Sequence, residues 1–152
     1  MTESDLDSEL EKLQSESVNN GGTWRFLRLP IIQNKEDLKE FFKTIDIVVN
    51  MDSVNNKKVK KIIEESIDHW SLYSGPCPER TENSKEFDKL KIDFVKNLFR
   101  LIEEQDIIDI YRVENIDLWL NKVIESGIDH MNEDFIFQTN EGNYILHLGF
   151  SS

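Results

Sequence analysis

The sequence predicts a single α+β domain that is mostly helical, with about four main helices packed on a small antiparallel sheet. Apolar residues recur at helical spacing in several segments, and the longest of these runs from 83 to 104. Near the C-terminal end, two extended apolar runs flank the polar residues 140–143, which is typical of a β-hairpin. The length of 152 residues suits one domain. We expect this globular domain to span residues 23–152.

Residues 1–22 are acidic and precede the expected domain. Their charged side chains are Lys12 and the acids Glu3, Asp5, Asp7, Glu9, Glu11 and Glu16. Leu6, Leu10 and Leu13 are spaced as one stripe of a helix. Two interpretations follow: residues 1–22 form a flexible tail, or they form a short helix that docks in the groove of a partner. In the second interpretation the three leucines are partner-binding residues.

The first half of the domain is expected to hold one strand and two helices. Residues 23–29 have the composition of a strand. Apolar spacing predicts a helix over about 34–45. A further helix is expected over Val54–Tyr73, with Asp52 or Ser53 as its N-cap, because two prolines and a glycine follow Tyr73 closely.

The second half begins with the helix over 83–104, which Asn83 is expected to cap. The β-branched segment 107–113 predicts either a buried strand or a short helix. Apolar spacing indicates another helix over about 115–126, and the C-terminal hairpin follows it. In that hairpin, His147 is expected on the face opposite the aromatic side chains.

The charge of the chain restricts the class of partner. The formal net charge is −12, from 18 basic and 30 acidic residues, which disfavours direct binding to a nucleic acid or to an anionic membrane. No apolar run approaches the ~20 residues that cross a bilayer. A single cysteine fits a reducing compartment. We therefore expect an intracellular protein, cytoplasmic or nuclear, whose partner is another protein with a basic surface.

Two similar segments, Lys60–Trp70 and Asn121–Met131, suggest a metal site. Each carries Lys, Ile, Glu, Ile, Asp and His in the same register. Glu65, His69 and His130 would supply the carboxylate and imidazole ligands that zinc, iron or manganese accept. Helical geometry opposes this hypothesis, because a glycine is expected to end the second helix before His130.

A run of lysines opens the helix expected after residue 54. Lys57, Lys58, Lys60 and Lys61, here called the lysine run, lie where the helix dipole disfavours cations. A phosphate, a nucleic acid or an acidic face of a partner protein would offset that cost. The alternative is that the lysines form a solvated face.

The sequence carries no signature of catalysis. It has no phosphate-binding loop, no dinucleotide-binding glycine motif, no nucleophile elbow and no paired zinc-ligand motif. We therefore expect no cofactor and favour a non-enzymatic binding protein: an adaptor, an inhibitor or immunity-type binder, or a small subunit of a complex. The alternatives are a metal-binding protein that uses His69 and His130, and an inhibitor that mimics phosphates to block a nucleic-acid-binding protein.

Overall fold

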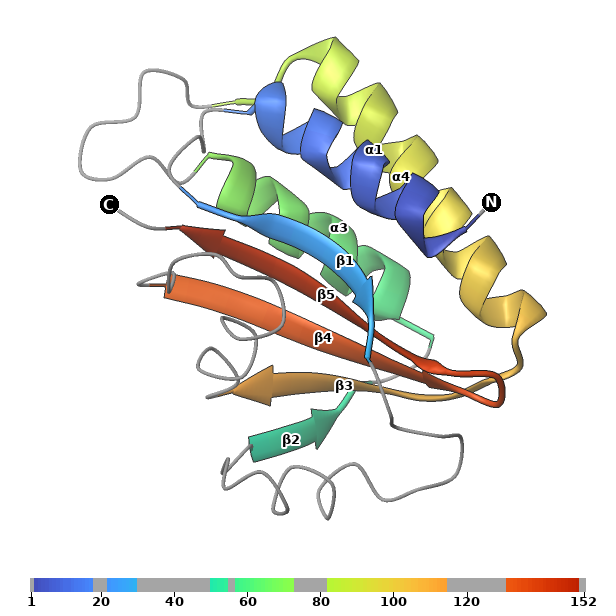
Figure 1. Cartoon of the computed structure of the whole chain (residues 1–152). Coiled ribbons are helices and arrows are strands. Elements are labelled where there is room, and N and C mark those ends of the chain that lie inside the picture. Colours follow the sequence, from blue (N-terminus) through green and yellow to red (C-terminus); the bar gives the residue numbers. More distant parts are fainter. Residues whose placement is uncertain are drawn as a thin grey trace.

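The computed structural model describes residues 2–17, 22–29, 50–54, 57–72, 82–114 and 131–150, and these form an α+β fold. Its helices and strands are α1 (Glu3–Ser15), β1 (Trp24–Arg28), β2 (Asn50–Ser53), α3 (Val59–Ser71), α4 (Lys85–Glu104), β3 (Ile107–Glu114), β4 (Met131–Thr139) and β5 (Asn143–Phe150). The strands build one antiparallel sheet in the order β1-β5-β4-β3-β2 (Figure 1).

The α+β class is confirmed, but the balance of helix and sheet differs from the expectation. The described residues hold three helices and a five-stranded sheet, so neither "mostly helical" nor "small" describes this part of the chain. The helices expected over about 34–45 and 115–126 lie outside the described residues. No helix among the described residues combines the length and the apolar character needed to cross a bilayer.

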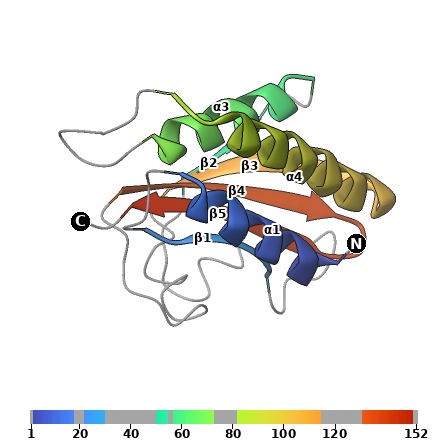
Figure 2. The same ribbon diagram turned by 90° about the horizontal axis from the view of Figure 1, so that it is seen from above.

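All three described helices cover the same face of the sheet (Figures 1 and 2). Alternate residues of the strands point to this face, because successive side chains of a strand face opposite sides. The aromatic rings of Phe26 and Tyr144 stack with their centroids 5.5 Å apart, and Phe26 also meets Phe137 edge to face. The apolar stripes of the helices complete one hydrophobic core with these rings.

The second face of the two central strands is buried as well. Ile136 and Ile145, whose side chains point away from the helices, are fully buried. Asp134 and His147 lie on the same face and are 1% and 4% exposed. Because β4 and β5 are buried on both faces, they form the best protected part of the sheet.

Helix α1 belongs to the folded domain, which corrects the expected boundary at residue 22. A capping box begins it: Thr2 accepts a hydrogen bond from the Asp5 amide, and the Asp5 carboxylate accepts one from the Thr2 amide. Leu6, Leu10 and Leu13 are each 0% exposed and lie in the common core. The leucine stripe of α1 therefore packs against β1 and α4 of its own chain.

Asp7 fastens α1 to the edge of the sheet. Among the described strands β1 pairs only with β5, so no described strand satisfies the backbone groups on its other side. The Asp7 carboxylate accepts a 2.8 Å hydrogen bond from the Phe26 amide and forms an ion pair of 3.0 Å with Arg25. One carboxylate therefore satisfies an edge amide and orients a neighbouring side chain.

Two expected helix starts are shifted. Residues Asn50–Ser53 form β2, paired with β3, so Asp52 and Ser53 are strand residues and α3 starts later, at Val59. Ser84, not Asn83, caps α4, because its hydroxyl accepts the hydrogen bond from the Phe87 amide. The segment that could be strand or helix is the strand β3, and the C-terminal hairpin is confirmed.

Candidate functional site

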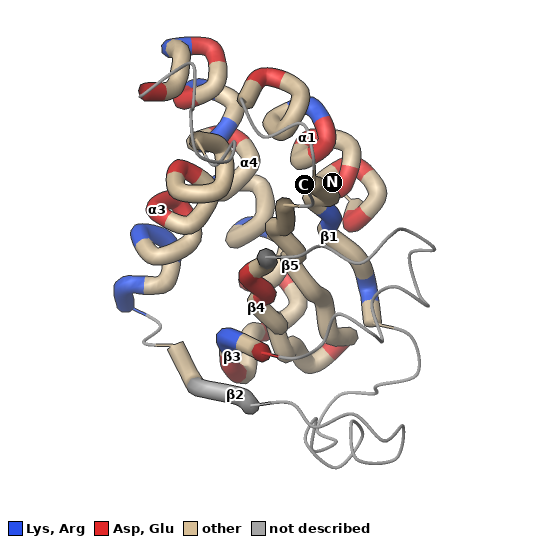
Figure 3. The backbone as a smooth tube through the Cα atoms, turned by 90° about the vertical axis from the view of Figure 1, so that its left-hand side faces the viewer, with Lys and Arg blue, Asp and Glu red and all other residues tan. Residues whose placement is uncertain are grey.

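The lysine run lies at the beginning of α3, where its cations are exposed. Lys58 is the N-cap residue and makes no capping hydrogen bond with its side chain, and the first turn of α3 contains no acid. The positive end of the helix dipole therefore adds to the positive charge of the lysines. In Figure 3 the blue of Lys and Arg gathers at this end of α3, and the red of Asp and Glu follows further along the helix.

Two adjoining hollows lie beside the lysine run and together form what we call the α3–α4 groove. The larger, about 530 Å³, lies between α3 and α4, and the smaller, about 400 Å³, extends toward β3. Lys60, Phe99 and Glu103 line both. Val95 and Phe99 form a nearly buried floor, whereas Ile92 at one end is 56% exposed. The Lys60 ammonium lies 5.3 Å from the centre of the Phe99 ring.

Many charges around the groove are not neutralised by neighbours. Lys58, Lys96 and Arg100 form no ion pair with any residue of the described chain. Lys61 approaches Glu65 at 3.9 Å, but both side chains are mostly exposed, so this pair contributes little. The groove therefore presents cations that are available to a charged partner.

A second charged surface, here called the acidic ridge, joins α1 to α4 and consists of Asp5, Glu9 and Asp93. Glu9 accepts a 3.0 Å hydrogen bond from the Asn97 side chain. Burial raises the pKa of Glu9, and repulsion by Asp93 and Asp5 acts in the same direction, while the Asn97 bond opposes both. Asp93 and Asp5 thus add to the cost of ionising Glu9.

The three leucines proposed as partner-binding residues are buried within the chain. Leu6, Leu10 and Leu13 contact the core beneath α1 and expose no surface. A partner cannot reach them while α1 is in place. We therefore correct this expectation: the stripe holds α1 to its own sheet and helix α4.

The proposed metal ligands are not brought together within the described residues. Glu65 is exposed and lies near Lys61, and His69 is exposed and meets the Trp70 ring edge to face at 5.1 Å. His130 and the second similar segment lie outside the described residues, apart from the backbone of Met131. The described chain contains no group of three or more His, Cys, Asp or Glu side chains that could hold a metal ion.

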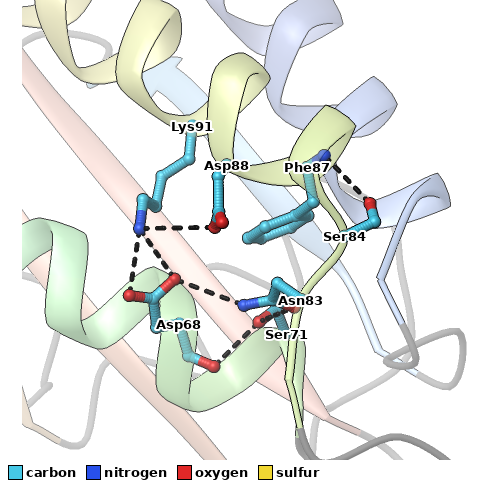
Figure 4. A network of polar contacts seen from close by, with 7 residues as sticks. All are labelled: Asp68, Ser71, Asn83, Ser84, Phe87, Asp88 and Lys91. Atoms are coloured by element: carbon cyan, nitrogen blue, oxygen red, sulfur yellow. Dashed lines mark hydrogen bonds and ion pairs between the residues drawn. The ribbon is translucent and has the colours of Figure 1, made fainter.

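A polar network ties the end of α3 to the beginning of α4 and so fixes the helices that form the groove (Figure 4). Lys91 forms a 2.9 Å ion pair with Asp68 and is only 12% exposed. The Ser71 hydroxyl lies 2.8 Å from the Asp68 carbonyl and 2.9 Å from the Asn83 side-chain oxygen. The Asn83 amide in turn donates to the Asp68 carboxylate. Asn83 therefore joins two helices instead of capping one.

Two notable features escaped the sequence reasoning. Ile92 lies off the apolar stripe of α4, and an isolated apolar residue on the polar side of a helix is the signal that could have identified it. His147 and Asp134 are direct cross-strand partners, 2.5 Å apart, and the Asn132 amide donates to Asp134 at 2.7 Å. Only the register of β4 and β5 reveals that buried pair.

Comparison with known proteins identified no relative of this chain. No family model matches it, and searches of curated proteins and of solved structures found no similar protein.

Proposed function

We propose that this chain is a non-enzymatic protein-binding protein that meets a basic partner through its acidic ridge. The observation that carries the proposal is the gathering of three carboxylates at the α1–α4 seam, where burial raises the pKa of Glu9 and repulsion by Asp93 and Asp5 adds to that rise. A cationic partner surface relieves this repulsion when it binds. An adaptor, an inhibitor or a small subunit of an intracellular complex would act in this way.

The overall charge supports the same function. A net charge of −12 attracts basic surfaces over distances of about a Debye length, ~8–10 Å at physiological salt, and repels nucleic acids and anionic lipids. Such attraction speeds association and selects against acidic partners more than it strengthens the final complex. The acidic ridge then supplies the local contact, because its carboxylates lie at the seam of two packed helices.

Affinity capture from a lysate with charge-neutralised variants tests the proposal. The test variant combines Asp5→Asn, Glu9→Gln and Asp93→Asn. The matched control removes the same charge at exposed positions outside α1 and α4, with Glu82→Gln, Glu114→Gln and Glu141→Gln. The wild-type chain and the control should retain the same basic protein at low salt, and the ridge variant should not.

Salt dependence and a direct titration complete this test. The captured protein should be released at about 1 M salt, where the screening length is ~3 Å. The captured protein, once purified, should bind the wild-type chain and the control variant with equal Kd. Equal retention by the ridge variant would overturn the proposal, as would a partner whose contact surface is acidic or uncharged.

A further inference from the structure

We infer that the α3–α4 groove is a second docking site, and that its occupant is an acidic, amphipathic helix of another protein. This inference does not depend on the acidic ridge, which lies at the α1–α4 seam and carries the opposite charge. The groove offers three things to such a helix: an apolar floor, an exposed apolar anchor point and a basic rim that includes Lys96 and Arg100.

The shape of the groove matches a short helix. Between Ile92 and Glu103 it follows α4 for about three turns, or ~16 Å. A helix placed in a groove of this kind contacts it with side chains at positions i, i+4 and i+7. Ile92, Val95 and Phe99 supply the apolar surface that would receive those side chains.

The charge of the groove selects the sign of the occupant. Four cations line the groove (Lys57, Lys60, Lys96 and Arg100) against three acids (Glu64, Glu103 and Glu104). Lys58 and Lys61 lie beside them at the start of α3, so this region is basic in a chain whose net charge is −12. The uncapped start of α3 adds its dipole to the same field. Carboxylates on the occupant would pair with Lys96 and Arg100, which form no ion pair with any described residue. A basic helix would be repelled.

The described part of a second copy fits the groove poorly. The outward face of α1 supplies acids, but its apolar side chains are buried in the core. Among the described residues, the exposed large hydrophobic side chains are Ile92 and Ile108 only. The occupant needs both carboxylates and exposed apolar anchors, which the described part of this chain does not offer together, so we assign the groove to a different protein.

Lys60 links the charge to the apolar floor. Its ammonium lies over the Phe99 ring, a contact that partly shields the floor in the unbound chain. A carboxylate on the occupant would draw Lys60 off the ring and leave Phe99 open to an apolar anchor. The same residue would therefore serve as a cover in the free protein and as an ion-pair partner in the complex.

A peptide selection on the intact chain tests the inference. The probe is a displayed library of random peptides long enough for about four helical turns, ~22 Å. The enriched sequences should carry carboxylates beside large apolar residues at helical spacing. The most enriched peptide, synthesised and labelled, is then titrated against variants by fluorescence anisotropy.

The variants separate groove contacts from general effects. Ile92→Asp and Arg100→Glu should each weaken the peptide about tenfold or more, as expected for residues at the centre of an interface. Ile108→Asp, the other exposed isoleucine, and Lys89→Glu, an exposed α4 lysine outside the groove, should leave its Kd unchanged. Because Ile92 is 56% exposed, its replacement should not lower the melting temperature appreciably.

Several outcomes would overturn the inference. A selection that enriches peptides without carboxylates, or that enriches none, would contradict it. So would peptides that bind the Ile92→Asp variant as tightly as they bind the wild type. Self-association that Ile92→Asp abolishes would assign the groove to a second copy instead. The ridge variant of the previous section should bind the peptide normally, so the two proposals fail independently.

Discussion

Replacing Leu10 by alanine tests whether α1 is part of the folded domain. Leu10 is 0% exposed and lies in the core between Leu6 and Leu13. The substitution removes three carbon groups at ~0.8 kcal/mol each, about 2.4 kcal/mol in total. The cavity left behind adds to this loss, so we expect about 3–4 kcal/mol, within the ~2–5 kcal/mol typical of such changes. Alanine's higher helix propensity offsets only a few tenths of a kcal/mol.

Urea unfolding followed by circular dichroism measures this loss. The midpoint should fall while the slope stays constant, because the surface exposed on unfolding barely changes. Ser8→Ala is the control: it lies on the exposed side of the same helix and should alter the free energy of unfolding by less than ~0.5 kcal/mol. If Leu10→Ala costs less than about 1 kcal/mol, α1 is detached in solution and the assignment of this helix to the core is wrong.

Three further substitutions probe polar contacts. Asp7→Ala should lower the free energy of unfolding by about 1–3 kcal/mol, because it leaves the Phe26 amide unpaired at the sheet edge. Asp7→Asn keeps an acceptor for that amide and should lower the free energy of unfolding by less. Equal losses in the two variants, measured by urea unfolding, would contradict this role of Asp7. Burial and neighbouring acids raise the pKa of Glu9, so its ionisation destabilises the fold as pH rises through that pKa. Glu9→Gln should therefore raise the melting temperature at pH 7 relative to wild type, and this gain should fade toward pH 4. A lower melting temperature of the variant at pH 7 would show that ionised Glu9 stabilises the fold, contrary to this reasoning. Asp68→Ala should cost about 1–2 kcal/mol in urea unfolding, because it leaves the nearly buried Lys91 without its 2.9 Å partner; Lys91→Met in the Asp68→Ala background should recover part of that cost.

The regular elements with strong periodicity could be predicted from the sequence. The apolar stripe of α4 repeats for about four turns, and helical spacing leaves little alternative to a helix. The hairpin of β4 and β5 has an apolar run on each side of a short polar loop, and the loop length fixes its register. In both cases the local pattern and the tertiary packing favour the same structure.

The predictions for α1 and β2 were wrong because local composition and tertiary structure favour different conformations there. Residues 3–15 have the charge of a tail, yet Leu6, Leu10 and Leu13 suffice to bury α1, because they meet a complementary surface on β1 and α4. The strand β2 is polar and short, and its extended conformation depends on pairing with β3. Neither fact is visible in a window of sequence.

The candidate sites were predictable only in part. The lysine run was visible, since it violates the charge preference of a helix start. The groove beside it was not, because it depends on how α3 and α4 pack and on the exposure of Ile92. The acidic ridge joins residues of α1 and α4 that are far apart in sequence, and Asn97 meets Glu9 at a separation of 88 positions.

The pairing of β1 with β5 also has a consequence for the order of folding. The bond from Arg28 to the Glu141 carbonyl spans 113 positions, so the first described strand must wait for the last one before it can join the sheet. Closing so long a loop is entropically costly and slows folding. Until then α1 has no completed sheet beneath it, and its leucine stripe stays open to other chains. Newly made copies of this protein should therefore depend on chaperone protection until β5 is released from the ribosome.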